Sequence, residues 1–313
     1  MGPAVTALER WWFEPVALGR IAVLRTVAYA FIWVDVLLTT SWIADHADVP
    51  GALYQPLAIG RLLHLPVPTA GFVRGIMVAL LATAVVAATN RAPRLLGWTV
   101  ALLYLEWMVI GQSYGKVDHD RFAFLVLLFA LATVGRARWG DRSPSEAAGW
   151  AMKVTMVAIV ATYFLSVFAK ARYGDGLMNW LDSATVSWAV VRRGTFLAEP
   201  LLQHPWTLQA SQYGVVALEL LAPVLLVLRG RSRDAMLAVY ASFHLVTFAT
   251  IGIIFLPHLV AMLVFVPLER LAVPWRRPPA ASEQSTPSAL RQMPVPEPRG
   301  VQAIPGMLQR PAD

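Results

Sequence analysis

Long apolar runs constrain the fold of this chain more than any other feature of its sequence. Two of them, residues 150–170 and 235–255, are long enough at ~1.5 Å per residue to cross a hydrocarbon core roughly 30 Å thick. The whole chain is 57% hydrophobic and only 14% charged, which excludes an ordinary soluble domain. We therefore expect an all-α fold, a polytopic integral membrane helix bundle.

Eight runs are apolar enough to be interpreted as membrane spans. They are approximately residues 16–42, 72–89, 95–113, 122–134, 150–170, 207–228, 235–255 and 258–273. The fourth and the eighth are short, so we expect tilt or partial insertion there. Residues 43–70 and 177–206 are too apolar for plain loops, and they predict interfacial or re-entrant helices on the outer side.

Arginines gather in alternate loops between these runs. Loops rich in Arg and Lys stay on the cytoplasmic side of a membrane, so we expect both termini to be cytoplasmic. The protein is then a multi-pass protein of the cell (inner) membrane. The outer segment after residue 170 is also basic, but it is long and folded, so its charges weigh less. The loop arginines are Arg91 and Arg94, Arg136, Arg138 and Arg142, and Arg229, Arg231 and Arg233.

The sequence divides into three parts. Residues 1–15 are expected to form a cytoplasmic N-terminal segment, residues 16–273 the transmembrane domain, and residues 274–313 a proline-rich cytoplasmic tail. The tail has too little apolar surface to offset the entropy of ordering, so we expect it to be disordered.

Composition excludes several kinds of site. The net charge of +7 is explained by the arginine-rich loops, so no nucleic-acid partner is expected. The absence of cysteine removes disulfides, thiolate metal sites and covalent haem attachment. Residues 115–121 (GKVDHDR) place His119 between two aspartates, which suits a general base or a metal ligand, although a solvated loop is the commoner explanation of such a segment. No second histidine stands at ligand spacing, so we predict no metal site. Only three basic residues are lysines, a bias typical of a GC-rich bacterial genome.

Two polar stripes lie on runs that are otherwise apolar. Residues three and four apart share one face of a helix, so each stripe could line a cavity or hydrogen-bond between helices. A charge inside a span costs at least ~2.5–3.5 kcal/mol and usually marks function, although a lysine at the end of its run could also snorkel to the interface. The stripes are Tyr163, Ser166 and Lys170, and Tyr240, His244 and Thr247.

Acidic side chains also fall inside the apolar runs. Glu106 and Glu219 lie in the third and sixth runs, and Asp35 lies in the first. Acids at this depth recur in proton and ion pathways, but they also pair structurally with cations, and pairing is the expected outcome here. The cations available are Arg25, Arg74 and Lys170.

Three places in the chain carry a family resemblance. Residues 163–170 (YFLSVFAK) end in a lysine that precedes Trp180, Asp118 and His119 enter the fourth run, and residues 242–244 (SFH) and 253–257 (IIFLP) mark the seventh. In this order the features resemble the HTTM domain, the horizontally transferred transmembrane domain of bacterial membrane proteins and of vitamin K-dependent gamma-glutamyl carboxylase. The resemblance covers roughly residues 10–272.

The resemblance implies a chemistry. In the carboxylase a lysine of this kind deprotonates vitamin K hydroquinone, which then reacts with oxygen to give a strong base. Lys170 would be that base, and His119 and His244 would line the quinol pocket. Apolar surroundings favour the neutral amine that a base requires, and removing such an unpaired lysine should leave stability nearly unchanged.

Two features depart from the carboxylase. The segment between Lys170 and Trp180 looks longer than in the animal enzyme. Only the proline-rich tail stands where the carboxylase has its large extramembrane domain, so we expect no binding of a protein substrate.

We predict an outward-facing polar cavity that binds a quinol-like or other lipidic small molecule, with base chemistry at Lys170. A vitamin K hydroquinone-like cofactor is implied by the resemblance alone, and membrane lipid surrounds the protein. The alternative is a non-enzymatic accessory or transport protein, such as a helper in the maturation or export of a secreted peptide, with a protein or peptide as its partner. The predicted pocket residues are His119, His244, Tyr163, Ser166, Tyr240, Thr247 and Glu106.

Overall fold

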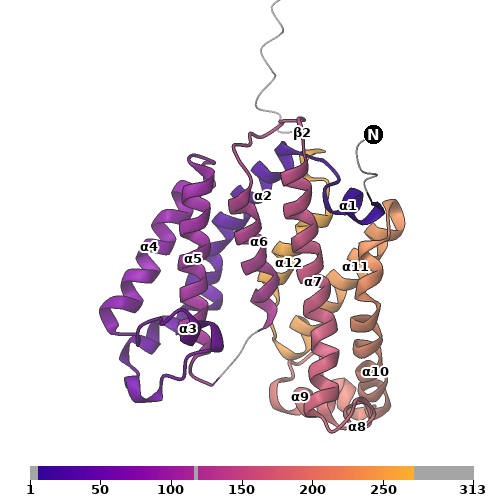
Figure 1. Ribbon diagram of the computed structural model, residues 1–313. Helices are drawn as coiled ribbons and strands as arrows, with labels where there is room; N and C mark the ends of the chain where they lie inside the picture. The colour runs from indigo at the N-terminus through magenta and orange to yellow at the C-terminus, as the bar shows by residue number, and fades with distance from the viewer. Residues whose placement is uncertain (1–5, 116–118, 271–313) are drawn as a thin grey trace, which may run out of the picture. The chain divides into compact units, whose positions relative to one another are not determined.

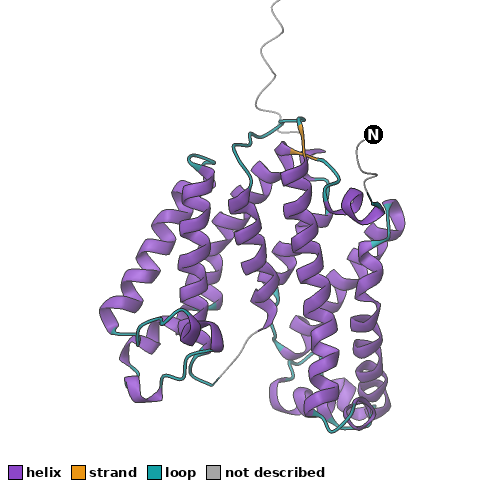
Figure 2. Cartoon of the chain, in the orientation of Figure 1, coloured by secondary structure: helices purple, strands orange, loops and turns teal. Residues whose placement is uncertain are grey.

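The computed structural model describes residues 6–115 and 119–270. These residues are mostly helical, and their strands are limited to one two-residue pair, so the prediction of an all-α bundle is confirmed (Figure 2). The prediction for the tail at 274–313 and the first five residues of the N-terminal segment lie outside the described residues, as does Asp118.

Within residues 6–115 and 119–270, six helices are long and apolar enough, by length and composition, to cross a membrane. The count of eight spans is not confirmed, because the fourth and eighth runs form shorter helices: α6 (Phe122–Thr133), and α12 (Leu256–Met262) with a 3-10 turn at Leu263–Phe265. The six long helices are α2 (Leu18–Val34, extended by a π-helical turn at Asp35–Thr39), α4 (Ala70–Ala88), α5 (Pro93–Gln112), α7 (Glu146–Tyr173), α10 (Pro205–Leu221, extended by a 3-10 turn at Ala222–Leu226) and α11 (Gly230–Ile251).

Short elements fill both segments that looked too apolar for loops. They hold α3 (Ala58–Leu62), α8 (Leu177–Leu181) and α9 (Thr185–Arg193), with 3-10 turns at Ser41–Asp48, Gly51–Leu53 and Glu199–Gln203. The remaining elements are α1 (Ala7–Trp12), 3-10 turns at His119–Arg121 and Leu268–Arg270, and the antiparallel pair β1 (Val16–Ala17) and β2 (Pro144–Ser145).

Two of the long helices present their apolar side chains outward. In the 18-residue apolar stretch of each helix, only 22% of α4 and 11% of α11 is buried. Val78 and Val85 on α4 and Leu245 and Val246 on α11 are all more than half exposed. Continuous apolar surface of this kind is not tolerated in water but matches lipid, which supports a multi-pass membrane protein.

The three arginine-rich loops lie at one end of the bundle, together with α1 and β2 (Figure 1). We call this the arginine-rich end. Arg20 binds Glu269 through two hydrogen bonds of 2.7 Å, and Lys153 binds Glu14 at 2.9 Å. Each cation holds the pKa of its carboxyl below the usual value. The Lys153–Glu14 pair ties the N-terminal segment to α7, whereas the Arg20–Glu269 pair and the β1–β2 bridge tie the start of α2 to the turn at Leu268–Arg270 and to the start of α7.

Arg25 is fully buried on α2 and does not pair with Asp35. Its guanidinium instead donates to the carbonyl oxygens of Leu131, Val134 and Gly135 at distances of 2.5–2.8 Å, where α6 ends. The last carbonyls of a helix lack intrahelical donors and carry partial negative charge. Arg25 therefore caps α6 and fixes its end against α2.

The position of the arginine-rich loops at one end generates a topology prediction. Because the chain has no cysteine, single cysteines can be introduced at exposed sites and labelled in intact cells. We expect Arg138→Cys and Arg231→Cys to be protected and Glu199→Cys, at the opposite end, to be labelled. Labelling of the first two with protection of the third would reverse the orientation.

Candidate functional site

One side of the candidate site is built by α7. The hydroxyl of Ser145 caps this helix by accepting a hydrogen bond from the backbone N–H of Ala148 (3.2 Å). Farther along, Tyr163, Ser166 and Lys170 lie on one face, as predicted from their spacing. Tyr163 is buried, whereas Ser166 and Lys170 are half-buried toward the end of the helix.

The opposite side comes from α11 and α12, which are joined by a tight reversal. Gly252 takes the left-handed conformation (φ 67°) and its N–H bonds to the carbonyl of Phe248 (2.9 Å), which ends α11. The chain then turns back into α12. This reversal brings the rings of His258 and His244 to 5.4 Å between centroids.

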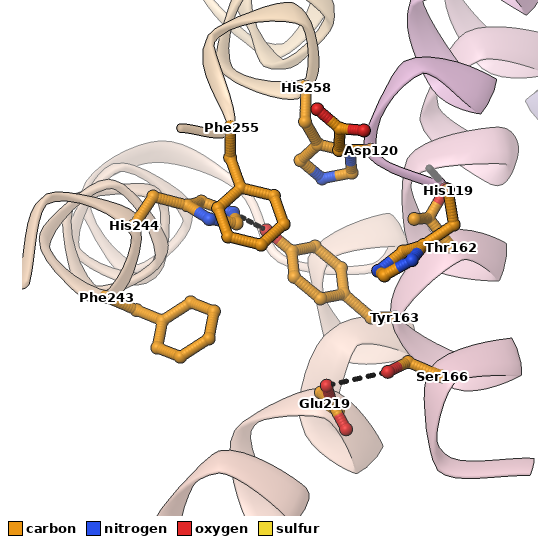
Figure 3. Close-up of a pocket in the computed structure, with 10 residues that line it drawn as sticks. All are labelled: His119, Asp120, Thr162, Tyr163, Ser166, Glu219, Phe243, His244, Phe255 and His258. Atoms are coloured by element: carbon orange, nitrogen blue, oxygen red, sulfur yellow. Dashed lines mark hydrogen bonds between the residues drawn. The ribbon is translucent and has the colours of Figure 1, made fainter. Parts of the chain in front are cut away.

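A hydrogen bond between Tyr163 and His244 closes the site. The phenol oxygen and Nε2 are 2.6 Å apart, and both side chains are buried (Figure 3). The ring of His258 lies edge-on to that of Tyr163 at 4.9 Å. Within the described residues, neither ring nitrogen of His258, nor Nδ1 of His244, has a hydrogen-bond partner. Buried polar groups without partners are uncommon, so three of them together mark a place where a bound molecule would supply the missing hydrogen bonds.

Lys170 is paired, contrary to the expectation of an unpaired base. Its Nζ lies 2.8 and 2.7 Å from the two carboxylate oxygens of Glu219 on α10, and 2.7 Å from Oγ of Ser166. Ser166 also donates to Glu219 (3.0 Å), and the ammonium stands 5.1 Å above the ring of Trp180. The expected pairing of a membrane acid with Lys170 is therefore confirmed at Glu219, and it stabilises the charged ammonium.

A small cavity lies between the Tyr163–His244 bond and the Lys170–Glu219 pair; Ser166 and Glu219 line it, and Lys170 does not. Its volume of ≈ 50 Å³ has room for a few water molecules, each of which needs about 10–15 Å³. Polar and aromatic side chains from five elements converge on it, as Figure 3 shows. The cavity is lined by His119, Asp120, Thr162, Tyr163, Ser166, Glu219, Phe243, His244, Phe255 and His258.

A second polar network adjoins the cavity through Asp120. Arg121 contacts both oxygens of Asp120 at 3.1 Å and Oδ1 of Asp35 at 3.3 Å. Tyr104 donates to the other oxygen of Asp35 (2.8 Å), and Thr39 also bonds to this carboxylate. The predicted pairing of Asp35 with a cation is correct, but its partner is Arg121 rather than Arg25 or Arg74.

Three of the predicted pocket residues do not line the cavity. Tyr240 packs its ring 4.7 Å from that of Tyr163 but donates its hydroxyl to the carbonyl of Leu218 (2.6 Å). Thr247 donates to the carbonyl of Phe243 on its own helix (2.8 Å). Glu106 is buried on α5, outside the residues that line the cavity. His119, Tyr163, Ser166 and His244 do line it.

Sequence reasoning missed His258, Phe255 and Phe243, and it treated Glu219 only as a structural partner. One signal for His258 was present: a glycine between two apolar stretches permits the reversal that faces residue 258 toward residue 244. Among the described residues, no group of three or more His, Asp and Glu side chains is arranged to hold a metal ion.

Comparison of the chain with protein-family models, curated proteins and solved structures gives no match.

The Lys170–Glu219 pair generates a stability prediction. Lys170→Met leaves a buried carboxylate without its cation, and we expect a loss of about 1–3 kcal/mol in the free energy of unfolding in detergent. Glu219→Gln should cost a similar amount, and the double variant should lose clearly less than the sum.

Lys153→Met is the matched control, because its partner Glu14 is 51% exposed and such pairs contribute about 0–1 kcal/mol. Strictly additive losses at 170 and 219 would show that the two side chains do not interact.

Proposed function

We propose that this protein is an HTTM-type multi-pass membrane protein that binds a quinol-like lipidic molecule at the cavity between α7, α10, α11 and α12. The observation that carries the proposal is the buried Tyr163–His244 hydrogen bond beside His258, whose two ring nitrogens have no partner in the described residues. The hydroxyl of a ligand in this cavity could bond to the side chains of Tyr163, His244 and His258, which packing already holds in position. Binding sites are typically apolar with a few convergent polar groups of this kind.

The neighbouring ion pair supplies a route for the proton of a bound hydroxyl. Lys170 becomes a base only as the neutral amine. Displacing water from the cavity favours that form, because desolvation penalises the separated charges and a proton on Nζ of Lys170 can transfer to Glu219 along their 2.7 Å hydrogen bond. Ser166 lines the cavity and bonds to both Lys170 and Glu219, so its hydroxyl can then accept the proton of the bound hydroxyl and pass its own proton to the neutral amine of Lys170.

Entry of a ring requires a side chain to move. A volume of ≈ 50 Å³ is well below the 300–1,000 Å³ typical of small-molecule pockets, so Phe255 or Phe243 must swing outward. The same small volume favours a second candidate function. A non-enzymatic accessory or transport protein could use the cavity for a few waters and a row of proton-binding groups, without any ring.

Ligand-induced thermal shift in nanodiscs distinguishes these functions. At a hundredfold excess over Kd, a naphthoquinol should stabilise the wild-type protein by about 2.7 kcal/mol. His258→Leu should abolish the shift. The substitution should also leave the unliganded protein stable, because the ring nitrogens of His258 have no hydrogen-bond partner in the described residues that would be left unpaired.

His204→Leu is the matched control, since His204 is exposed and does not line the cavity. Equal shifts in all three proteins, or no shift in the wild type and no quinone among its co-purifying lipids, would leave the accessory or transport function.

A further inference from the structure

A second and larger pocket lies at the arginine-rich end, between α1, α7 and the turn from α10 to α11. Its volume of ≈ 460 Å³ falls within the range of small-molecule sites. Apolar side chains of the helices, including Leu225 and Phe265, form one part of its lining. Trp11, Lys153 and Arg229 contribute to the other part. The pocket thus has one apolar and one cationic side, and it shares none of the residues of the proposed quinol site.

The charges that face this pocket are unbalanced. Lys153, Arg229 and Arg233 line it against one carboxylate, Glu14, so the formal charge is three minus one, or +2. Glu14 is already neutralised by Lys153 at 2.9 Å, and Lys153 also stands 4.7 Å above the ring of Trp11. The two arginines are therefore the cations left to bind something else.

Within the described residues, neither Arg229 nor Arg233 has a full set of hydrogen-bond or ion-pair partners. The Arg229 side chain forms no hydrogen bond or ion pair there; its positive charge helps to lower the pKa of Glu14, but that carboxylate is already paired with Lys153. The Nε of Arg233 is buried and has no hydrogen-bond partner; its one ion pair is a 3.9 Å contact with Asp234, whose side chain is 66% exposed. A buried guanidinium nitrogen without an acceptor costs free energy that an anion would recover.

We propose that this pocket binds the phosphate group of an anionic lipid headgroup. Arginines bind phosphate through two parallel hydrogen bonds, and α11, which is 22 residues long, begins at Gly230 in the pocket wall with the positive end of its dipole. The pocket lies at the ends of helices that can span a membrane, where headgroups are found, and Trp11 has the amphipathic ring typical of that depth. Basic pockets between such helices are suited to anionic lipids.

Lipid binding by the full chain in detergent tests the proposal. We expect phosphatidylglycerol to raise the thermal midpoint and phosphatidylcholine to have little effect. Each arginine near a headgroup contributes about fivefold in affinity, so the double variant Arg229→Gln/Arg233→Gln should bind phosphatidylglycerol roughly 25-fold more weakly. Arg229→Lys/Arg233→Lys, which keeps the charge, should retain part of the binding. Added salt should weaken the wild-type effect.

Arg91→Gln/Arg94→Gln is the matched control, since these arginines lie at the same end but do not line the pocket. It should bind phosphatidylglycerol like the wild type. A titration with inorganic phosphate separates the two sources of a phosphate group: protection by the lipid but not by the free anion supports the headgroup, and protection by the free anion alone overturns it. An unchanged lipid effect in Arg229→Gln/Arg233→Gln, or an equal loss in the control, would also overturn the proposal.

Discussion

A charged group between apolar helices has no water to compensate it, so another group of the protein must. This constraint governs how the helices of the bundle are arranged. Arg25 is compensated by backbone carbonyls of α6, Asp35 by Tyr104 and Arg121, and Lys170 by Glu219. Each contact joins elements far apart in the sequence. A shift of one helix along its neighbour would strand a buried charge, so these pairs select one register among the helices.

The residues of the cavity differ from these compensated charges. The Tyr163–His244 bond is satisfied, but neither ring nitrogen of the buried His258 has an acceptor or donor in the described residues. Arg25, Asp35 and Lys170 are each compensated by contacts of 2.5–3.3 Å, whereas these nitrogens, like Oε1 of Glu106 on α5, are unmatched. Unmet hydrogen-bonding capacity in a water-sized cavity is what a hydroxylated ligand or a proton path would use, and it sits beside the Lys170–Glu219 pair.

Sequence patterns predicted the parts of this structure that depend on local spacing. Apolar run lengths predicted the six long helices, and offsets of three and four predicted the Tyr163–Lys170 face. Partners across helices could not be predicted. Asp35 could have bound any nearby cation, and only the packing of α2, α5 and the turn at His119–Arg121 selects Arg121. Spacing also does not show that the hydroxyl of Thr247 binds the backbone of its own helix rather than facing the cavity.

In the resting protein, a charged Lys170–Glu219 pair holds the site together. Infrared spectroscopy of protein labelled with isotopic glutamate, compared with Glu219→Gln, measures the ionisation of Glu219 directly. We predict that the signal lost in the variant is that of an ionised carboxylate, because Nζ of Lys170 lies within 2.8 Å of both oxygens of Glu219. A lost signal from a protonated carboxylic acid would contradict it, since Lys170 would then be neutral before any ligand binds.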